Sequence, residues 1–271
     1  NGTSTMSSTV LLGAGSTERL KIDSTGLYVN GSSTALEGGA SDIDGLSDGY
    51  YDSDNIGLGS SAFDNNVSAA GSTVVGHNSG GELTTGGRVT LVGTNAGANT
   101  ATGWNTSYIG YDAGKNQTGS SNTAVGSLSQ TGVTNSSGTN NTSVGYSSLT
   151  ALTSGVHNVG IGRNVLNSIT SSEYNVAVGN YSLQAITDND AGHNVAVGHN
   201  AGKFLNEGKF NTFVGDDAGN SITVSTGYNT ILGAWAFKAQ TTGDKNIGVG
   251  YGAGDAVTTG SNNTVIGDLA G

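Results

Sequence analysis

Hydrophobic and polar positions alternate over short stretches that recur along most of the chain. In "HNVAVGHNAG" (193–202), Val195 and Val197 stand three positions and one position before Gly198, with a small residue between them. This period of two predicts a half-buried strand of about four residues whose valines point into the core. The pattern occurs thirteen times, and a glycine marks the end of each strand: Gly59, Gly76, Gly93, Gly110, Gly126, Gly145, Gly162, Gly179, Gly198, Gly215, Gly233, Gly250 and Gly267.

These marking glycines are 16 to 19 residues apart, and most intervals are 17. A fixed period of this kind indicates a repeat architecture. One copy is too short to fold alone, because the entropy lost on ordering it exceeds what its few buried side chains return. Copies therefore have to stack, so that each strand gains hydrogen-bonding neighbours. We predict an all-β fold, a β-solenoid (β-roll) of about 13 repeats of about 17 residues, roughly 60 Å long at about 4.8 Å per strand.

The segment after each strand is expected to turn sharply. The marking glycine allows a positive φ or a close backbone approach that a Cβ would block. A second apolar pair follows four and seven residues later in several copies, as in Leu149 with Leu152 and Leu166 with Ile169. A spacing of three residues suits either one helical turn or a bent arc of chain, and the sequence leaves both open.

Stacking places equivalent residues of successive coils about 4.8 Å apart, where like charges repel one another. Uncharged amides and hydroxyls form ladders there instead. Asparagine stands four positions before the marking glycine in ten copies, which predicts an amide ladder with Asn194 as one rung. The composition agrees, since only 11% of the residues are charged. Each copy also offers little apolar material, so we expect several chains to share a core.

Charge and composition exclude several classes of function. The net charge is −11 and only nine residues are Lys or Arg, which argues against nucleic acid and anionic membranes as partners. No run of about 18 apolar residues is present, so no membrane insertion is expected. The absence of cysteine excludes disulfides and thiolate metal sites.

The repeats also resemble those of a known family. "NTAVG" (122–126), "NTSVG" (141–145), "NVAVG" (175–179 and 194–198) and "NTVIG" (263–267) are similar to the head repeats of trimeric autotransporter adhesins of the YadA type and, more closely, to repeats in bacteriophage tail fibres. The resemblance implies parallel β-rolls that associate as an intertwined or side-by-side homotrimeric rod. The adhesin repeats have a period nearer fourteen residues, so the shape of the coil is expected to differ.

The first 54 residues do not follow the period, which divides the chain into three parts. Residues 1–40 are expected to form a small β-hairpin module, because "RLKIDSTGLYVNG" (19–31) predicts two strands around "DSTG" and resembles modules of marine phage fibres. Residues 41–54 form an acidic connector, and residues 55–271 form the repeat solenoid.

Aromatic residues give the clearest candidates for recognition. Alignment on the marking glycines places one residue, five positions earlier, in a column of five successive copies: His157, Tyr174, His193, Phe210 and Tyr228. One interpretation is a structural ladder of stacked rings; the other is a track for the sugar rings of a host polysaccharide. Trp104 and Trp235 are further candidates for receptor contact or for packing against a neighbouring chain. The residues one and two positions after the glycine, such as Tyr146 and Arg163, are expected to face solvent.

The chemical candidates are weaker. The connector residues Asp42, Asp44, Asp48, Asp52 and Asp54 provide carboxylates for Ca²⁺, but their spacing does not fit a calcium loop, which favours a solvated linker. Asp216, Asp217 and Glu207 offer the residue types of a glycosidase pair. His77 and His199 share a column but lie seven copies apart, too far to bind one metal ion. We therefore predict no catalytic residue, no metal site and no cofactor.

The predicted function is structural and adhesive rather than enzymatic. We expect a rod in the tail fibre of a virion that holds or presents a surface for host recognition, with further copies of the chain, other tail or fibre proteins and host surface polysaccharide as partners. One alternative is a trimeric autotransporter-type adhesin on a bacterial cell surface. A second alternative is a tailspike that degrades polysaccharide.

Overall fold

The structure is a computed structural model. It describes the backbone of residues 10–11, 20–23, 26–29, 32–35 and 49–51 and, with side chains, residues 54–65, 68–223 and 227–271. Within the first 40 residues it places four strands in one antiparallel sheet: β1 (Val10–Leu11), β2 (Leu20–Asp23), β3 (Gly26–Val29) and β4 (Ser32–Ala35). The pairing of β2 with β3 confirms the two strands expected around "DSTG".

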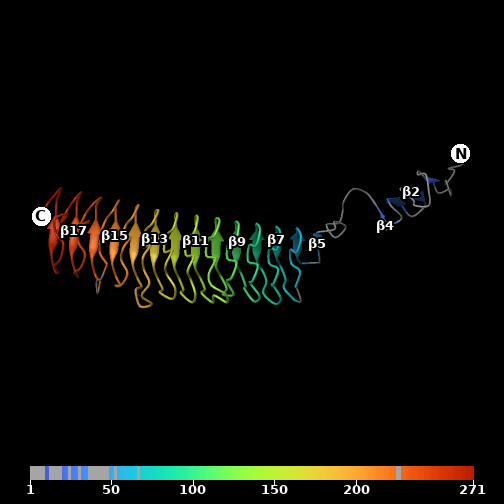
Figure 1. The fold of residues 1–271 in the computed structure, drawn as a ribbon, viewed down its shortest axis with the longest axis horizontal. Helices are drawn as coiled ribbons and strands as arrows, with labels where there is room; N and C mark the ends of the chain where they lie inside the picture. Colours follow the sequence, from blue (N-terminus) through green and yellow to red (C-terminus); the bar gives the residue numbers. More distant parts are fainter. Residues whose placement is uncertain are drawn as a thin grey trace.

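The repeats form a parallel β-solenoid with the predicted spacing of about 17 residues, and its strands stand side by side along one axis (Figure 1). Each strand has three residues and ends directly before a marking glycine. The parallel strands are β6 (Ile56–Leu58), β7 (Thr73–Val75), β8 (Thr90–Val92), β9 (Ser107–Ile109), β10 (Thr123–Val125), β11 (Thr142–Val144), β12 (Val159–Ile161), β13 (Val176–Val178), β14 (Val195–Val197), β15 (Thr212–Val214), β16 (Thr230–Leu232), β17 (Ile247–Val249) and β18 (Thr264–Ile266).

The sheet begins earlier than the repeats do. Strand β5 (Gly49–Tyr51) lies inside the segment expected to be a connector, and it pairs antiparallel with β6 at the end of the solenoid sheet. Three residues of the connector therefore cover the edge that β6 would otherwise present. The sheet thus ends in a short antiparallel strand, and a very short edge strand is a poor template for pairing with another chain.

The marking glycines behave as predicted. All thirteen have φ between 123° and 142°, and Gly198 has φ 141°. A Cβ placed on Gly198 would lie 2.3 Å from the carbonyl oxygen of Gly215 in the next coil. The glycine column thus lets successive backbones approach more closely than any side chain would allow.

The prediction that the valines point into the core is wrong. In β14 the buried residue is Ala196, which is fully covered, while Val195 and Val197 are 37% and 38% exposed. The alternation is real but its phase is reversed: the middle residue of each strand points inward and its two neighbours point outward. The physical reason lies in the arc after the strand, which supplies the large side chains that fill the coil.

That arc is not a helical turn. The residues two and four positions after the marking glycine have positive φ in every coil, as at Ser147 (51°) and Leu149 (52°), whereas a right-handed helix requires negative φ. Of the two possibilities that the spacing of three left open, the bent arc is therefore the one observed. Leu149 and Leu152, like Leu166 and Ile169, are fully buried inside it.

The centre of the strand and the arc position four residues after the marking glycine share the same interior space, so in most coils only one of the two carries a large side chain. Where the strand contributes Tyr108 or Phe213, the residue six positions later is Gly114 or Gly219, and a Cβ there would lie within 2.6 Å of the ring. Where the arc contributes a leucine, the strand centre is small, as at Gly160. This exchange of volume keeps the interior close-packed while the backbone repeats.

The amide ladder predicted at the asparagine column is present. From Asn122 to Asn246 each Oδ1 atom accepts two hydrogen bonds from the next rung, one from its backbone N–H and one from its side chain, and Asn263 is the last donor. For Asn211 bonding to Asn194 both distances are 3.0 Å. The eight rungs from Asn122 to Asn246 are fully buried, so the ladder is an internal polar spine.

A polar interval divides the apolar core into two clusters. One contains buried residues from Ala62 to Ala124 and the other those from Leu149 to Ala253. Gln117 and Gln130 are fully buried between them, and neither side chain hydrogen-bonds to any residue that the structure describes. Uncompensated burial of an amide is costly, so this interval is a weak point of the solenoid.

Replacing Gln130 with leucine is expected to stabilise the protein by about 1–2 kcal/mol, because the change removes a buried unpaired amide and joins the two cores. Gln130 occupies the same place in its coil as Leu149, and φ at Gln130 (47°) lies close to φ at Leu149 (52°), so the backbone accepts leucine. Urea denaturation measures the difference. A variant of lower stability would contradict this account of the polar interval.

Candidate recognition surface

The predicted aromatic column forms a continuous ladder of rings on the surface. Its five residues lie in successive coils, all in the left-handed region of φ, between 57° and 63°. Neighbouring ring centroids are 4.8 to 5.3 Å apart and the planes differ by 8° to 19°. All five side chains are exposed in the single chain. The spacing follows the pitch of the sheet, so the coil dictates the stacking.

Stacking limits what the ladder can bind. Tyr174, His193 and Phe210 each have a ring on both sides, so only their edges face solvent. Tyr228 is the last ring, stacked on Phe210 on one side only, and it is 53% exposed. A sugar stacks on an aromatic face rather than on an edge. The ladder therefore supports itself along most of its length and offers a ring face to a ligand only at its ends.

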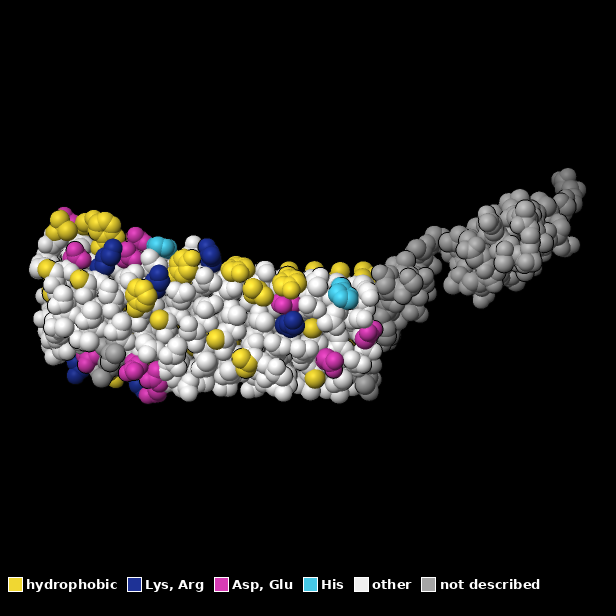
Figure 2. Space-filling model, viewed as in Figure 1, with side chains coloured by type: hydrophobic (Ala, Val, Ile, Leu, Met, Phe, Trp, Pro, Cys, Tyr) yellow, Lys and Arg dark blue, Asp and Glu magenta, His cyan; other side chains and the backbone are white. Residues whose placement is uncertain are grey.

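A second row of exposed side chains follows the marking glycines. The residues expected to face solvent there are all exposed: Tyr111, Tyr146, Arg163, His199, Asp216, Trp235 and Tyr251. Arg163 lies over the rings of Tyr146 and Tyr181, with its guanidinium carbon 5.9 and 5.7 Å from the two ring centroids. Figure 2 shows hydrophobic, basic, acidic and histidine side chains gathered along the edges of the solenoid, while the face between them is mostly uncharged.

The two tryptophans lie in different places. Trp235 belongs to this second row; its ring is 5.3 Å from that of Tyr251 at a tilt of 40°, and Lys238 Nζ lies 4.9 Å from it. Trp104 lies one position before the column of the ladder, in an earlier coil, and pairs through its backbone with Gly87. Both are about 40% exposed, and the structure does not bring them together with the ladder into one site.

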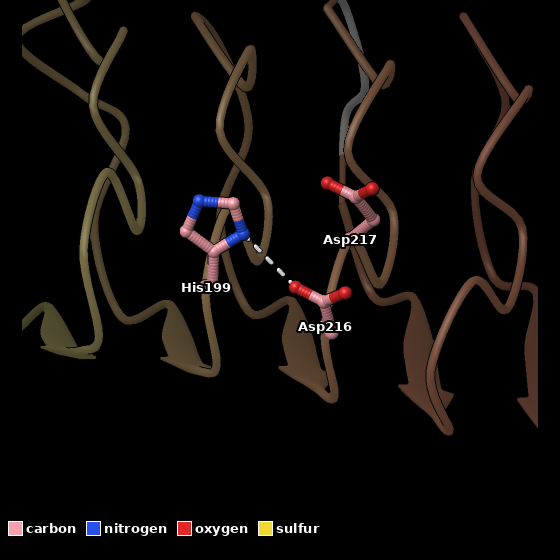
Figure 3. Close-up of side chains that lie close together, drawn as sticks. All are labelled: His199, Asp216 and Asp217. Carbon is pink, nitrogen blue, oxygen red and sulfur yellow. Dashed lines mark hydrogen bonds and ion pairs between the residues drawn. The ribbon is translucent and has the colours of Figure 1, made fainter.

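A cluster of His199, Asp216 and Asp217 gathers on two successive coils (Figure 3). One ligand atom of each lies within 4.8 Å of the others, and His199 Nδ1 is 3.0 Å from Asp216 Oδ1. The carboxylate of Asp217 already has partners, however. Lys238 Nζ is 2.8 Å from its Oδ2, and Asn200 and Asn220 donate to its Oδ1.

These contacts lower the pKa of the Asp217 carboxyl. Partial burial works to raise the pKa of its carboxyl, but Lys238 and the two amides outweigh burial and hold that pKa below the ordinary value. Asp217 in turn raises the pKa of Lys238. An ammonium group already occupies the place where a cation would bind, which leaves His199 and Asp216 as the available ligands. Two exposed side chains on their own would hold a metal ion only weakly.

The other chemical candidates stay apart. His77 Nδ1 lies 3.1 Å from the backbone oxygen of Ser60, far along the chain from His199. Glu207 is an exposed residue in the loop before β15. Of the acidic connector residues only Asp54 has a described side chain, since Asp42, Asp44, Asp48 and Asp52 lie outside the described residues.

A hollow lies beside the aromatic ladder, and the sequence analysis did not predict it. It has a volume of about 450 Å³, and its lining includes Glu173, Asp190, Lys209 and Tyr228. It lies where the interval between Gly179 and Gly198 lengthens to 19 residues, and that insertion was the available signal in the sequence.

Comparisons with protein-family models, with curated proteins and with solved structures found no match for the chain. Within the described parts of the chain, no helix is long and apolar enough to cross a bilayer.

Proposed function

We propose that this chain is a structural and adhesive protein, a homotrimeric β-solenoid rod in a bacteriophage tail fibre that carries or presents a host-receptor binding surface. The repeat resemblance supports the virion location and the number three. The observation that carries the proposal is an apolar stripe on the outer face of the sheet. Its thirteen members precede the marking glycines: Leu58, Val75, Val92, Ile109, Val125, Val144, Ile161, Val178, Val197, Val214, Leu232, Val249 and Ile266.

Every member of the stripe is aliphatic, and every one is half-buried or exposed in the single chain. The stripe is about 60 Å long and about 5 Å wide, or roughly 300 Å², which is the lower end of the range for the largest apolar patch on a typical monomer, about 300–600 Å². The outward column two positions earlier is Thr or Ser in eight of its thirteen members, and it widens this uncharged face to roughly 600 Å², close to the roughly 800 Å² that each partner buries in a standard interface. The size favours a permanent cover for this face.

A second copy of the chain is the cover that fits best. The stripe repeats at the strand pitch, about 4.8 Å, over the full length of the sheet. Another copy, placed parallel around an axis along the rod, presents the same residues at the same pitch, so all coils meet partners at once. Three such faces would form an additional core between the chains, outside the apolar interior that each solenoid already has. Three receptor-binding surfaces per rod then let weak contacts add.

Charged substitutions in the stripe test the assembly. Ile161→Asp combined with Val197→Asp is expected to convert the trimer to a monomer, because both side chains are exposed in the single chain and become buried only on association. Light scattering with sedimentation gives the mass. Val133→Asp is the matched control, since Val133 is 51% exposed but lies in a loop away from the sheet, and it should leave the mass unchanged. A wild-type chain that is a stable monomer with native circular dichroism would contradict the proposal.

Two alternatives make different predictions. An autotransporter-type adhesin on a bacterial cell would be encoded with a membrane anchor downstream, which reading the gene beyond this sequence decides. A polysaccharide-degrading tailspike would release reducing ends from host capsule. The lowered pKa of Asp217 does not favour the second, because a general acid in glycoside hydrolysis needs a raised pKa.

A further inference from the structure

The hollow beside the aromatic ladder lies where a glycine, Gly192, stands between two long charged side chains in equivalent positions of successive coils. Six positions before the marking glycine, successive coils carry Glu173, Gly192 and Lys209. Gly192 leaves a gap between two long side chains of opposite charge, about 10 Å apart at two strand pitches. A Cβ on Gly192 would lie 2.6 Å from the backbone oxygen of Glu173, so close packing of the coils requires glycine there.

The polar groups around this gap form contacts with one another and with a neighbouring coil. Lys209 Nζ lies 2.5 Å from Asp190 Oδ2, and this contact raises the pKa of Lys209, so the side chain stays charged. Asn189 Oδ1 accepts a hydrogen bond from Thr170 Oγ1 at 2.9 Å. Asp190 and Asn189 both belong to the lengthened interval before β14, so the insertion supplies one wall of the hollow.

The aromatic ladder supplies the other wall. His193, Phe210 and Tyr228 line the hollow. Ring edges carry partial positive charge and attract hydroxyl oxygens, whereas a ring face packs against C–H groups. Phe210 stacks on the face of Tyr228 that is turned towards the hollow, so the ladder presents ring edges to it. The hollow thus combines ring edges, carboxylates, an amide and an ammonium group.

We propose that this hollow binds a pyranose unit of a neutral or amino-bearing polysaccharide. The volume of about 450 Å³ lies within the range of small-ligand sites, about 300–1,000 Å³. A polyol needs donors and acceptors together, and Asn189, Glu173 and the Asp190–Lys209 pair provide both. Two carboxylates face one ammonium group, and the chain carries a net charge of −11, so acidic sugars are disfavoured.

This inference deepens the proposed function by naming the class of receptor, and it rests on that function only for the source of the sugar. The test uses the full chain on an array of neutral, amino-bearing and acidic (uronic or sialic acid) oligosaccharides, followed by titration calorimetry with the strongest member. Lys209→Ala and Glu173→Gln are expected to weaken binding at least 10-fold each. Both residues are on the surface, and circular dichroism verifies that the variants fold.

Lys238→Ala is the matched control. Like Lys209, Lys238 pairs with an aspartate on the surface, but it lies over the ring of Trp235 and outside the hollow. Unchanged sugar affinity in this variant, with loss in Lys209→Ala, supports the site. Binding to acidic glycans alone, equal binding by Lys209→Ala, or no binding to any sugar overturns it. Light scattering on the same samples reports the trimer separately, so failure of the sugar site is distinguishable from failure of the rod.

Discussion

Replacing Gly198 with alanine is expected to destabilise the protein by about 4 kcal/mol or more, which places the change among the exceptional single substitutions. Two costs add. The residue has φ 141°, a conformation that L side chains rarely adopt, and its Cβ would lie 2.3 Å from the oxygen of Gly215. The neighbouring coil is backbone at this point and has no side chain to move aside. Thermal unfolding measures the effect, expected at about 10 °C or more.

Gly267→Ala separates the two costs. Gly267 has φ 133°, so alanine meets a similar backbone strain there, but the nearest atom to its Cβ would be Ala270 Cβ at 3.4 Å rather than the backbone of another coil. The variant is expected to lose much less stability than Gly198→Ala. The difference between the two variants is the cost of pushing adjacent coils apart. Equal losses would show that φ alone explains the glycine column and that the contact between coils is relaxed easily.

Replacing Asn194 with alanine is expected to cost about 3 kcal/mol or more, because the backbone N–H of Asn211, the side chain of Asn211 and the oxygen of Gly208 each lose a hydrogen bond, at about 1–3 kcal/mol each. Asn194 Oδ1 accepts from the backbone N–H and the side chain of Asn211, and Asn194 Nδ2 donates to Asn175 Oδ1 and to the oxygen of Gly208. Alanine removes these bonds in the middle of the stack. Urea denaturation at fixed protein concentration gives the loss.

Asn99→Ala is the control for this rung. Asn99 also donates to an equivalent side chain in the next coil, Asn116 Oδ1 at 2.6 Å, but that pair is exposed. Water replaces an exposed hydrogen bond at little cost, so this variant is expected to stay within about 0.5 kcal/mol of the wild type. If the two variants lost similar stability, the buried asparagine column would contribute no more to stability than a row of exposed amides does.

Much of the fold was accessible from the chain itself. The intervals between Gly59 and Gly267 predicted the number and pitch of the coils, since a repeating backbone requires a repeating sequence. The glycine conformation and the amide ladder at Asn194 also followed, because steric exclusion and hydrogen-bonding capacity are properties of the residue type. The same alignment predicted the column of rings from His157 to Tyr228.

The sequence did not predict which residues of each strand point inward. Val195 and Val197 predicted the correct alternation with the wrong phase, because a period of two does not say which set of residues is inside. The interior of that region is filled from the arcs, by residues such as Leu183, and by Phe213 from the next strand, which leaves the small Ala196 as the inward residue. Hydrophobicity favoured the valines for the core, but the large side chains of the arcs leave room only for a small inward residue, so the valines point outward.

Tertiary structure alone also decided the candidate sites. Glu173, Asp190 and Lys209 surround one hollow, and Asp217 pairs with Lys238, although consecutive members of each set are 17 to 21 residues apart in the sequence. The pattern of residues within one repeat does not show which side chains of neighbouring coils will meet, because an insertion changes the alignment of one coil with the next. The sequence by itself determined the stack and its period, because both repeat. The inward face, the outer apolar stripe and the hollow at Gly192 depended on how unequal side chains share the space between coils.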